Sequence, residues 1–353
     1  MPLNNTISSI QDTAPTNERS IPIEVQASDD IPYDLYELRY HYGIIIEDVK
    51  GDNVFVTTVK PGLGQTNMEI ISETPNLKNR PLHRHNYIEL MFTLSGNLNQ
   101  RIEEKYMTYH AGQCCILNRN VCHTEEFTED FQAAFIMVST DMVRHIIDSH
   151  KLFDESHKVF DRHNYLSQLL MDDDGSGRGR KEYMDLVPMV PYEELKEHLE
   201  SILDGLVKIT YHDQPGNFLI FEAALIRFLC FLFDEELYQC SVKSEKMTNR
   251  EDLFISITHI LEKYNGRVSR QKLEDLLNYS GDYLNKIVKA NTGLNLNDYG
   301  QKFTLKEAER MLRYSDMSIT EIINALGFSN RSYFYRIFTE KFGMTPVEFR
   351  KRR

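Results

Sequence analysis

Side chains that could bind a small molecule or a metal ion recur at alternate positions of one short segment. These residues are His83, His85, Tyr87 and Glu89. Because successive side chains of a β-strand point to opposite faces, the spacing predicts that all four project from one side of a strand. Imidazole and carboxylate groups gathered there could orient a polar ligand, or bind zinc, iron, nickel or copper.

A further histidine, His123, could join this group if its strand returns past His83 and His85. The pattern His-x-His-x3-Glu-x6-Gly, followed by Gly-x10-His, resembles the two sequence motifs of the cupin barrel. The second motif departs at Asn118 and Asn120, where cupins tend to have proline and glycine. The resemblance implies a β-barrel that binds an effector through His83, His85, Tyr87, Glu89 and His123.

The interior of such a barrel leaves two kinds of occupant open. A small organic effector is favoured, because inward polar groups of a barrel of this size can orient one small molecule. In that case no cofactor is expected. The alternative is a divalent transition metal, with His83, His85, Glu89 and His123 as its ligands. The nearby cysteines are expected to be buried packing groups; they are Cys114, Cys115 and Cys122.

Two segments of the last hundred residues share one layout of a short helix, a turn and a second helix. The predicted helices are Val268–Leu277 and Gly281–Ala290 in the first segment, and Ile319–Leu326 and Arg331–Phe342 in the second. A serine of each turn is expected to begin the second helix, where its hydroxyl can accept a free backbone N–H. One longer helix, Leu296–Tyr314, is predicted between the two segments.

This repeated helix-turn-helix layout is typical of DNA binding. Two recognition helices held roughly 34 Å apart reach successive turns of the major groove on one face of a duplex. Polar side chains near the start of each second helix would read base edges, and basic side chains would contact phosphates. The second helix-turn-helix offers Asn330, Arg331, Ser332, Tyr335 and Arg336, and the first offers Asp282, Asn285, Lys286 and Lys289.

The second helix-turn-helix resembles the signature of the AraC/XylS family of bacterial transcription regulators. The resemblance is carried by the run Ile322–Phe338, by Phe342–Pro346 and by Arg350, and it extends over roughly residues 250–353. It implies a regulator, usually an activator, that binds promoter DNA and RNA polymerase. It also implies a cupin-type N-terminal domain that responds to a small-molecule effector.

The resemblance weakens before the second helix-turn-helix. The family usually has a glycine where this chain has Asn278, and an aromatic residue where it has Val288. An arginine is common in the family where this chain has Thr304. The first helix-turn-helix is therefore predicted to keep the fold but to differ in its base contacts.

The charge of the chain is divided unevenly along its length. The net charge is −13, yet residues 250–353 hold 18 Lys and Arg against 13 Asp and Glu. The rest of the chain carries a net charge of −18. This asymmetry predicts a basic module that meets DNA and an acidic part with a different role.

The spacing of apolar residues and the positions of turn residues predict a multidomain α+β protein. Short strands are expected before residue 140, including Asn53–Val59, with Gly96 among the residues that end strands. Helices are expected afterwards, with an exposed polar stretch before residue 250. The predicted parts are a flexible N-terminal tail (1–30), a cupin-like β-barrel (31–140), a helical connector (141–249) and an all-α tandem helix-turn-helix domain (250–353).

Two helices of the connector, Glu193–Tyr211 and Phe218–Phe233, are predicted to pair across a two-fold axis and form a homodimer. The alternative is that both cover the barrel within one chain. The second helix is apolar but shorter than the ~20 residues that a membrane span needs. The polar, acidic start does not resemble a signal peptide, and five cysteines suit a reducing compartment. We therefore expect a cytoplasmic protein with no membrane partner.

Together these features predict a transcription regulator and not an enzyme. Two other function classes remain open. One is a regulator controlled by a protein partner through its helical middle, and the other is a metal-dependent cupin enzyme with a helical appendix. A footprint on promoter DNA would favour a regulator, whereas bound metal with turnover of a substrate would favour the enzyme.

Overall fold

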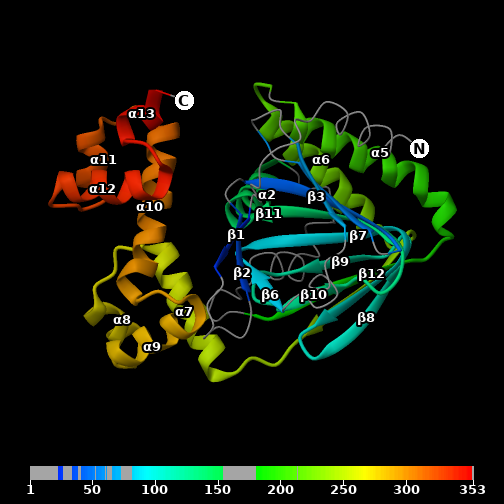
Figure 1. The fold of residues 1–353 in the computed structure, drawn as a ribbon, viewed down its shortest axis with the longest axis horizontal. Coiled ribbons are helices and arrows are strands. Elements are labelled where there is room, and N and C mark those ends of the chain that lie inside the picture. The colour runs from blue at the N-terminus through cyan, green and yellow to red at the C-terminus, as the bar shows by residue number, and fades with distance from the viewer. Residues whose placement is uncertain are drawn as a thin grey trace. The chain divides into compact units, whose positions relative to one another are not determined.

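The segment that carries His83 and His85 lies in a large, mostly antiparallel sheet, which forms the main part of the N-terminal domain (Figure 1). The structure is a computed structural model that describes residues 23–26, 34–38, 41–51, 53–59, 61, 66–72, 82–153, 180–212 and 214–351. The chain divides into an N-terminal domain, residues 1–247, and a C-terminal domain, residues 248–353. The predicted beginning of the DNA-binding module at residue 250 lies close to this division.

Thirteen described strands make up the sheet, and only β2 and β6 pair in parallel. Its main path runs β1-β2-β6-β10-β7-β11-β3-β4-β5, with β8 and β9 paired to β7, β12 to β9, and β13 to β12. The strands are β1 (Ile23–Gln26), β2 (Asp34–Leu38), β3 (Tyr42–Lys50), β4 (Asn53–Val59), β5 (Thr66–Ser72), β6 (His83–His85), β7 (Tyr87–Ile102), β8 (Lys105–His110), β9 (Cys114–Leu117), β10 (His123–Glu126), β11 (Phe131–Ser139), β12 (Glu182–Pro188) and β13 (Tyr238–Ser244).

Strand β7 joins the two halves of the sheet. Its first part pairs with β9 and β11, and its last part pairs with β8 and β10. Gly96 lies where the partners change, with φ of +72°. A Cβ atom there would run into the carbonyl of Asp130, so only glycine fits without displacement. The prediction that Gly96 ends a strand is wrong, because β7 continues through it.

The two faces of this sheet are both buried. On β11, Ala134 and Ile136 pack toward the helices, whereas Ala133 and Phe135 belong to an interior cluster that also includes Tyr109 of β8. Because side chains alternate between two buried faces, these strands are almost continuously apolar. The interior cluster takes side chains from both halves of the sheet, so the sheet surrounds a core of its own.

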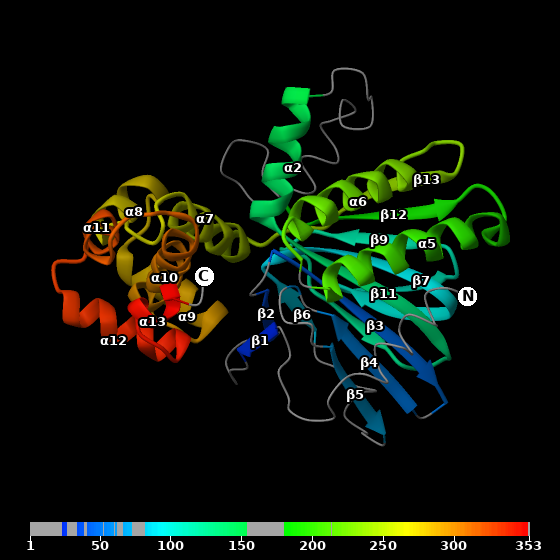
Figure 2. The same cartoon turned by 90° about the horizontal axis from the view of Figure 1, so that it is seen from above.

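Three described helices belong to the N-terminal domain: α2 (Thr140–Phe153), α5 (Tyr192–Tyr211) and α6 (Asn217–Leu232). Figure 2 shows α5 and α6 side by side across one face of the sheet. Leu199 and Leu203 of α5 and Phe221 and Leu225 of α6 are buried against that face. The structure therefore contains the arrangement that was the alternative to pairing across a two-fold axis: both helices cover the sheet of their own chain. No described helix is long and apolar enough to cross a membrane.

The region predicted to be a helical connector also contains two strands, which is a correction. Strand β12 pairs with β9, with Leu186 opposite Cys114, and β13 pairs with β12. The exposed polar stretch expected before residue 250 is partly this last strand, whose outer face is polar. The predicted barrel and the predicted connector, up to residue 247, therefore belong to one domain.

The predicted flexible tail is wrong at Ile23–Gln26, which forms strand β1 beside β2. The remainder of the predicted tail, residues 1–22 and 27–30, lies outside the described residues. The cysteines agree with the predicted packing role, since Cys114, Cys115 and Cys122 are buried. Burial also raises the pKa of Cys115 well above its usual range, which keeps the thiol unreactive.

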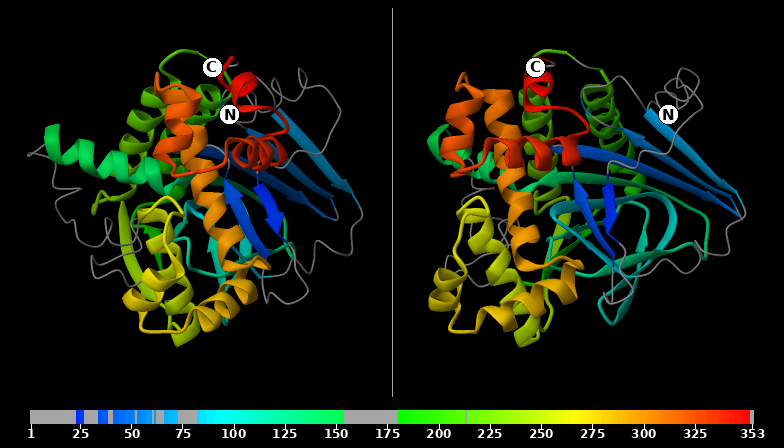
Figure 3. Two further views of the ribbon diagram at one scale, coloured as in Figure 1. Left: turned by 90° about the vertical axis from the view of Figure 1, so that its left-hand side faces the viewer. Right: turned by 60° about the vertical axis from the view of Figure 1, so that its left-hand side comes forward.

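The C-terminal domain consists of two helix-turn-helix units on one long helix. Its helices are α7 (Asn249–Lys263), α8 (Arg270–Leu277), α9 (Gly281–Thr292), α10 (Leu296–Tyr314), α11 (Ile319–Ala325), α12 (Arg331–Phe342) and α13 (Pro346–Lys351). Tyr299 of α10 packs in the core of the first unit, and Ala308 and Leu312 pack in the core of the second. Figure 3 shows α10 in orange between the yellow helices of the first unit and the red helices of the second.

Candidate DNA-binding surface and buried histidine cluster

Helix α12 is the better defined of the two candidate recognition helices. It begins after Asn330, whose side-chain oxygen accepts the backbone N–H of Tyr333 at 3.0 Å. The prediction that a serine begins this helix is wrong, because Ser329 precedes the capping residue. The first-turn backbone N–H groups are also the groups that a phosphate would contact, so capping by Asn330 fixes that end of the helix.

The two sides of α12 have different roles. Phe334, Ile337 and Phe338 are buried in the core of the second unit, at the spacing of one helix face. Arg331 and Arg336 are exposed on the opposite side. The predicted contact residues Ser332 and Tyr335 lie on the same helix, Ser332 exposed and Tyr335 half-buried against the core.

Each of the two arginines of α12 lies over an aromatic ring of the same helix. The guanidinium of Arg331 donates to the hydroxyl of Tyr335 at 3.1 Å and lies 5.2 Å from the centre of its ring. The guanidinium of Arg336 lies 5.3 Å from the ring centre of Tyr333. Sequence reasoning missed Tyr333, although an exposed aromatic residue in the first turn of a recognition helix is a usable signal. Its hydroxyl donates to Gln301 of α10 at 3.2 Å.

The first helix-turn-helix keeps its turn without the glycine that the family usually has. Asn278 adopts the left-handed conformation, with φ of +58°, and asparagine tolerates this region better than most residues. Ser280 begins α9 as predicted and accepts the backbone N–H of Tyr283. The side chain of Thr304 is buried and donates to the carbonyl of Asn265 at 2.8 Å, so this position has a structural role here.

The predicted contact residues of α9 are not equivalent. Lys286 and Lys289 are exposed and available to a polyanion. Asn285 accepts the backbone N–H of Leu296 at 2.8 Å, so its carbonyl group fixes the beginning of α10. Asp282 is highly exposed and accepts a hydrogen bond from Arg270 at 2.7 Å. The two lysines are therefore the main candidates for DNA contact in the first unit.

A second candidate site lies inside the N-terminal domain, where the predicted histidines come together. His83 on β6 is the register partner of His123 on β10, and their ring centres are 4.3 Å apart. The Nε2 atom of His123 donates to Glu89 at 3.1 Å, and Nε2 of His85 lies 3.9 Å from the same carboxylate. All four of these residues are buried. Tyr87 stacks on the ring of His85, with 4.1 Å between the ring centres.

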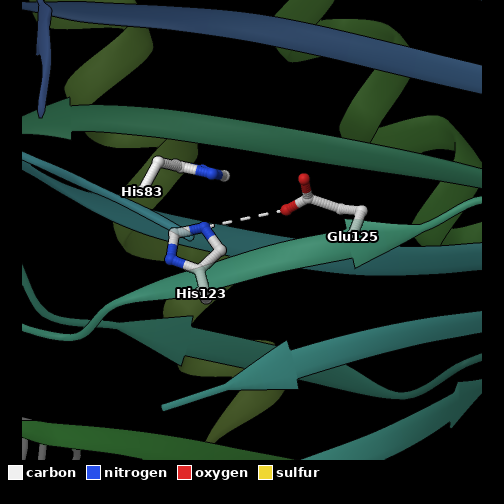
Figure 4. Close-up of side chains that lie close together, drawn as sticks. All are labelled: His83, His123 and Glu125. Carbon is white, nitrogen blue, oxygen red and sulfur yellow. Dashed lines mark ion pairs between the residues drawn. The ribbon is translucent and has the colours of Figure 1, made fainter. Parts of the chain in front are cut away.

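The strand that was predicted to carry these residues is broken. His83 and His85 lie on β6, the chain bends at Asn86, and Glu89 lies on β7. Glu89 and the two histidines nevertheless approach His123 from neighbouring strands. Sequence reasoning missed Glu125, which lies two residues after His123 on β10 and so faces the same side. Figure 4 shows the side chains of His83, His123 and Glu125 pointing toward one another.

The pKa values of the two central histidines move in opposite directions. Burial, with the neighbouring His123 and His83, holds the pKa of His85 well below its ordinary value. Burial would also lower the pKa of His123, but the hydrogen bond that it donates to Glu89 and the charges of Glu89 and Glu125 outweigh it. The pKa of His123 is therefore raised. Burial thus disfavours the charged form of His85, whereas the two carboxylates favour the charged form of His123.

The donor set of this cluster fits a metal ion. Two groups, His83-His123-Glu125 and His85-Glu89-His123, have ligand atoms that lie within 4.8 Å of one another. Atoms bound about 2.0–2.2 Å from a zinc ion lie about 3–3.6 Å apart. The Nε2 atom of His123 lies 3.1 Å from Glu89 and 3.7 Å from Glu125, which is close to that range. Imidazole and carboxylate ligands together suit divalent transition metals.

Comparisons with known proteins agree on the C-terminal domain. A family model described as a helix-turn-helix domain matches residues 273–352. The probable transcription factor PqrA of Proteus vulgaris is 39% identical over 83 residues, which cover 23% of this chain and 68% of that protein. The Msm operon regulatory protein of Streptococcus mutans is 28% identical over 136 residues, covering 38% of this chain and 48% of that protein.

Among solved structures, the C-terminal domain of the response regulator yesN from Fusobacterium nucleatum matches with 27% identity and a TM-score of 0.25. The match covers 27% of this chain and 93% of that one. The chain spans about half the length of several curated relatives that it matches. From the signature of α11 and α12, the matched model and the similarity to PqrA, the chain belongs to the AraC/XylS family of helix-turn-helix regulators.

Proposed function

We propose that this protein is a sequence-specific DNA-binding transcription regulator that acts at promoters. The observation that carries the proposal is α12, a capped helix whose exposed side presents Arg331 and Arg336 while its other side is buried. Such a helix can enter a major groove with its first turns toward the base edges. The regulatory names of PqrA and the Msm operon protein support the same assignment.

The remaining partners follow from this role. Double-stranded promoter DNA is the polyanion that the C-terminal domain meets, and activation would require contact with RNA polymerase. We place the protein in the cytoplasm, where both partners are found, and assign it no catalytic activity. The buried cluster of His85, Glu89 and His123 serves as the sensing site, and its occupancy shifts the population of DNA-binding arrangements.

The test is a selection for binding sites with the full-length chain. Random duplex DNA is partitioned through several rounds, and the enriched sequence is footprinted. We expect a discrete protected site and an affinity that falls steeply with salt, because Lys and Arg contacts release counterions from the phosphates. Retention of no sequence above the random pool would contradict the proposal.

We also propose that two copies pair through one side of α6. Leu219, Ala223, Ile226 and Cys230 follow one another at intervals of four, three and four residues. Along this α6 stripe Leu219 and Ala223 are exposed, and Ile226 and Cys230 are partly buried. Leu219 is 62% exposed. Intervals of three and four place apolar residues in the seam between two packed helices. Exposed leucine and isoleucine side chains on the outer side of a helix favour a partner surface, so a second copy is the proposed cover.

Leu219→Glu is expected to convert the dimer to a monomer, because a charge would enter the apolar seam. Sedimentation at micromolar concentration measures this change directly. The matched control is Met189→Glu, which alters a residue of similar exposure, 59%, away from α6. A wild-type chain that sediments as a monomer with and without DNA, or a Leu219→Glu dimer, would refute the interface.

A further inference from the structure

We propose that Arg267 is a positioning residue, which fixes the separation and orientation of the two helix-turn-helix units and thereby the spacing of the two DNA segments that they bind together. Arg267 lies in the turn between α7 and α8 of the first unit, whereas its side chain contacts the turn between α11 and α12 of the second. The inference rests on the proposed DNA-binding function, and it names a determinant of specificity outside the recognition helices.

The two units have separate cores that are joined through α10. Tyr299 belongs to the core of the first unit, and Ala308 and Leu312 belong to the core of the second; no described side chain belongs to both. Gly300 lies inside α10, between these positions. Because a glycine inside a helix makes its backbone easier to deform, α10 alone leaves the two units free to bend relative to each other. A direct contact between the units therefore restricts that bending.

The turn that carries Arg267 is attached to α10 at two points. Asn265 and Gly266 both have positive φ, +49° and +72°, which makes the turn tight. The hydroxyl of Thr304 donates to the carbonyl of Asn265 at 2.8 Å. Gly266 packs so closely on α10 that a Cβ atom there would overlap the carbonyl of Gly300. The backbone of Arg267 therefore has a fixed position on α10.

The guanidinium of Arg267 contacts the second unit in two ways. It donates from Nη2 to the carbonyl of Gly327, and it lies 5.1 Å from the ring centre of Phe328. It also covers the Cα atom of Gly327, where a Cβ atom would collide with it. Arginine suits this position, because its planar group can donate a hydrogen bond and also pack on an aromatic ring.

Phe328 connects this contact to the recognition helix α12. Its ring centre lies 5.1 Å from that of Phe334 and 6.2 Å from that of Tyr333, and both of these residues belong to α12. Gly327 and Phe328 also belong to the turn that leads into α12. A displacement of this turn from Arg267 would therefore move α12 relative to α9, the candidate recognition helix of the first unit.

The spacing of the two bound DNA segments depends on this placement. Each added base pair moves the second segment by about 3.4 Å along the duplex and turns it by about 35°. If α9 and α12 are fixed relative to each other, only one spacing lets both make their contacts. One base pair more or less should then weaken wild-type binding by about 5- to 150-fold, the cost of one good base contact.

Arg267→Ala should reduce this discrimination between spacings severalfold. Selection from random DNA with the full-length chain gives the accepted spacings, and fluorescence anisotropy compares duplexes with one base pair inserted or deleted between the two protected segments. The matched control is Lys263→Ala, which removes an exposed positive charge from the end of α7 and should keep the wild-type preference.

The salt dependence separates this role from an ordinary phosphate contact. Loss of a phosphate contact weakens all spacings equally and lowers the salt dependence by about one counterion, whereas loss of a positioning contact changes the ratio between spacings. Arg267→Lys keeps the charge but not the planar group, so its spacing preference should resemble that of Arg267→Ala. An equal loss at all spacings in both variants would overturn the inference.

Distances between spin labels test the contact without DNA. The labels are attached to ketone-bearing unnatural residues at Ala290 of α9 and Lys341 of α12, which are both exposed. Thiol-directed labels are avoided because Cys240 is also exposed. An excess of unlabelled chain restricts the signal to pairs within one copy. We expect one narrow distribution of distances in the wild type and in Lys263→Ala, and a broader one in Arg267→Ala.

The two measurements separate this inference from the proposed function. If the wild type selects a DNA site but Arg267→Ala keeps the spacing preference or the narrow distribution, the inference is overturned and the regulator stands. A wild type that selects no DNA overturns the regulator, and a broader distribution in Arg267→Ala would still support the contact between the units. A wild type that binds all spacings equally overturns the inference.

Discussion

Arg331→Ala and Arg336→Ala are each expected to weaken binding of the full-length chain to its selected DNA site by about 5- to 150-fold, which corresponds to about 1–3 kcal/mol for a base contact. Both side chains are exposed and contribute to no core, so the fold should persist. Fluorescence anisotropy with labelled duplex at several salt concentrations measures the affinity. If an arginine contacts a phosphate, its loss lowers the salt dependence by about one counterion and weakens all sequences equally.

Lys341→Ala is the control for the loss of one positive charge. Lys341 lies in the last turn of α12, far along the helix from Arg331, and it is exposed. It should change the affinity much less than either arginine variant. Unchanged affinity in both arginine variants would show that α12 does not enter the groove.

Phe334→Ala is expected to destabilise the second helix-turn-helix by about 3–5 kcal/mol, the usual range for removing a buried phenyl ring. Phe334 is fully buried, and the rings of Phe328 and Phe338 lie 5.1 and 5.7 Å from its own. Because a domain is stable by only about 5–15 kcal/mol, this loss should lower its melting temperature markedly and abolish specific DNA binding.

Calorimetry and DNA binding together test this expectation. Tyr333→Ala, at the neighbouring and exposed position, should leave the transition nearly unchanged, whereas Phe334→Leu should restore part of the lost stability. A Phe334→Ala chain that melts like the wild type would contradict the core described for α12.

Regular periodicity made part of this fold predictable. Helix α10 and strand β4 begin and end where the apolar pattern predicts, because one face of each is buried continuously. The sequence analysis required a strand carrying His123 to return past the first histidines if His123 was to join them, and β10 does so opposite His83. The exposed side of α12 was predictable, because apolar residues recur along this helix at the spacing of one face and polar residues occupy the other.

Other features depend on contacts between distant segments, which local patterns do not contain. Gly96 resembles a turn residue, yet it marks the point where β7 changes partners. Asn330 caps α12, and Asn285 accepts the backbone N–H of Leu296 at the beginning of α10. Sequence reasoning assigned both side chains to DNA, since a polar side chain near a helix end serves either role. Glu125 was identifiable from its spacing to His123, but its closeness to Glu89 required the pairing of three strands.

The pairing of β9 with β12 has a consequence for the synthesis of this protein. Cys114–Leu117 of β9 must wait for residues 182–188 to leave the ribosome, and β13 then covers the outer edge of β12. Until residues 182–188 have emerged, the edge of β9 that pairs with β12 presents unpaired backbone groups to other nascent chains. Helix α7 begins at residue 249, so the N-terminal domain completes its sheet immediately before the C-terminal domain emerges. A fragment ending at residue 140 would retain that open edge and should aggregate.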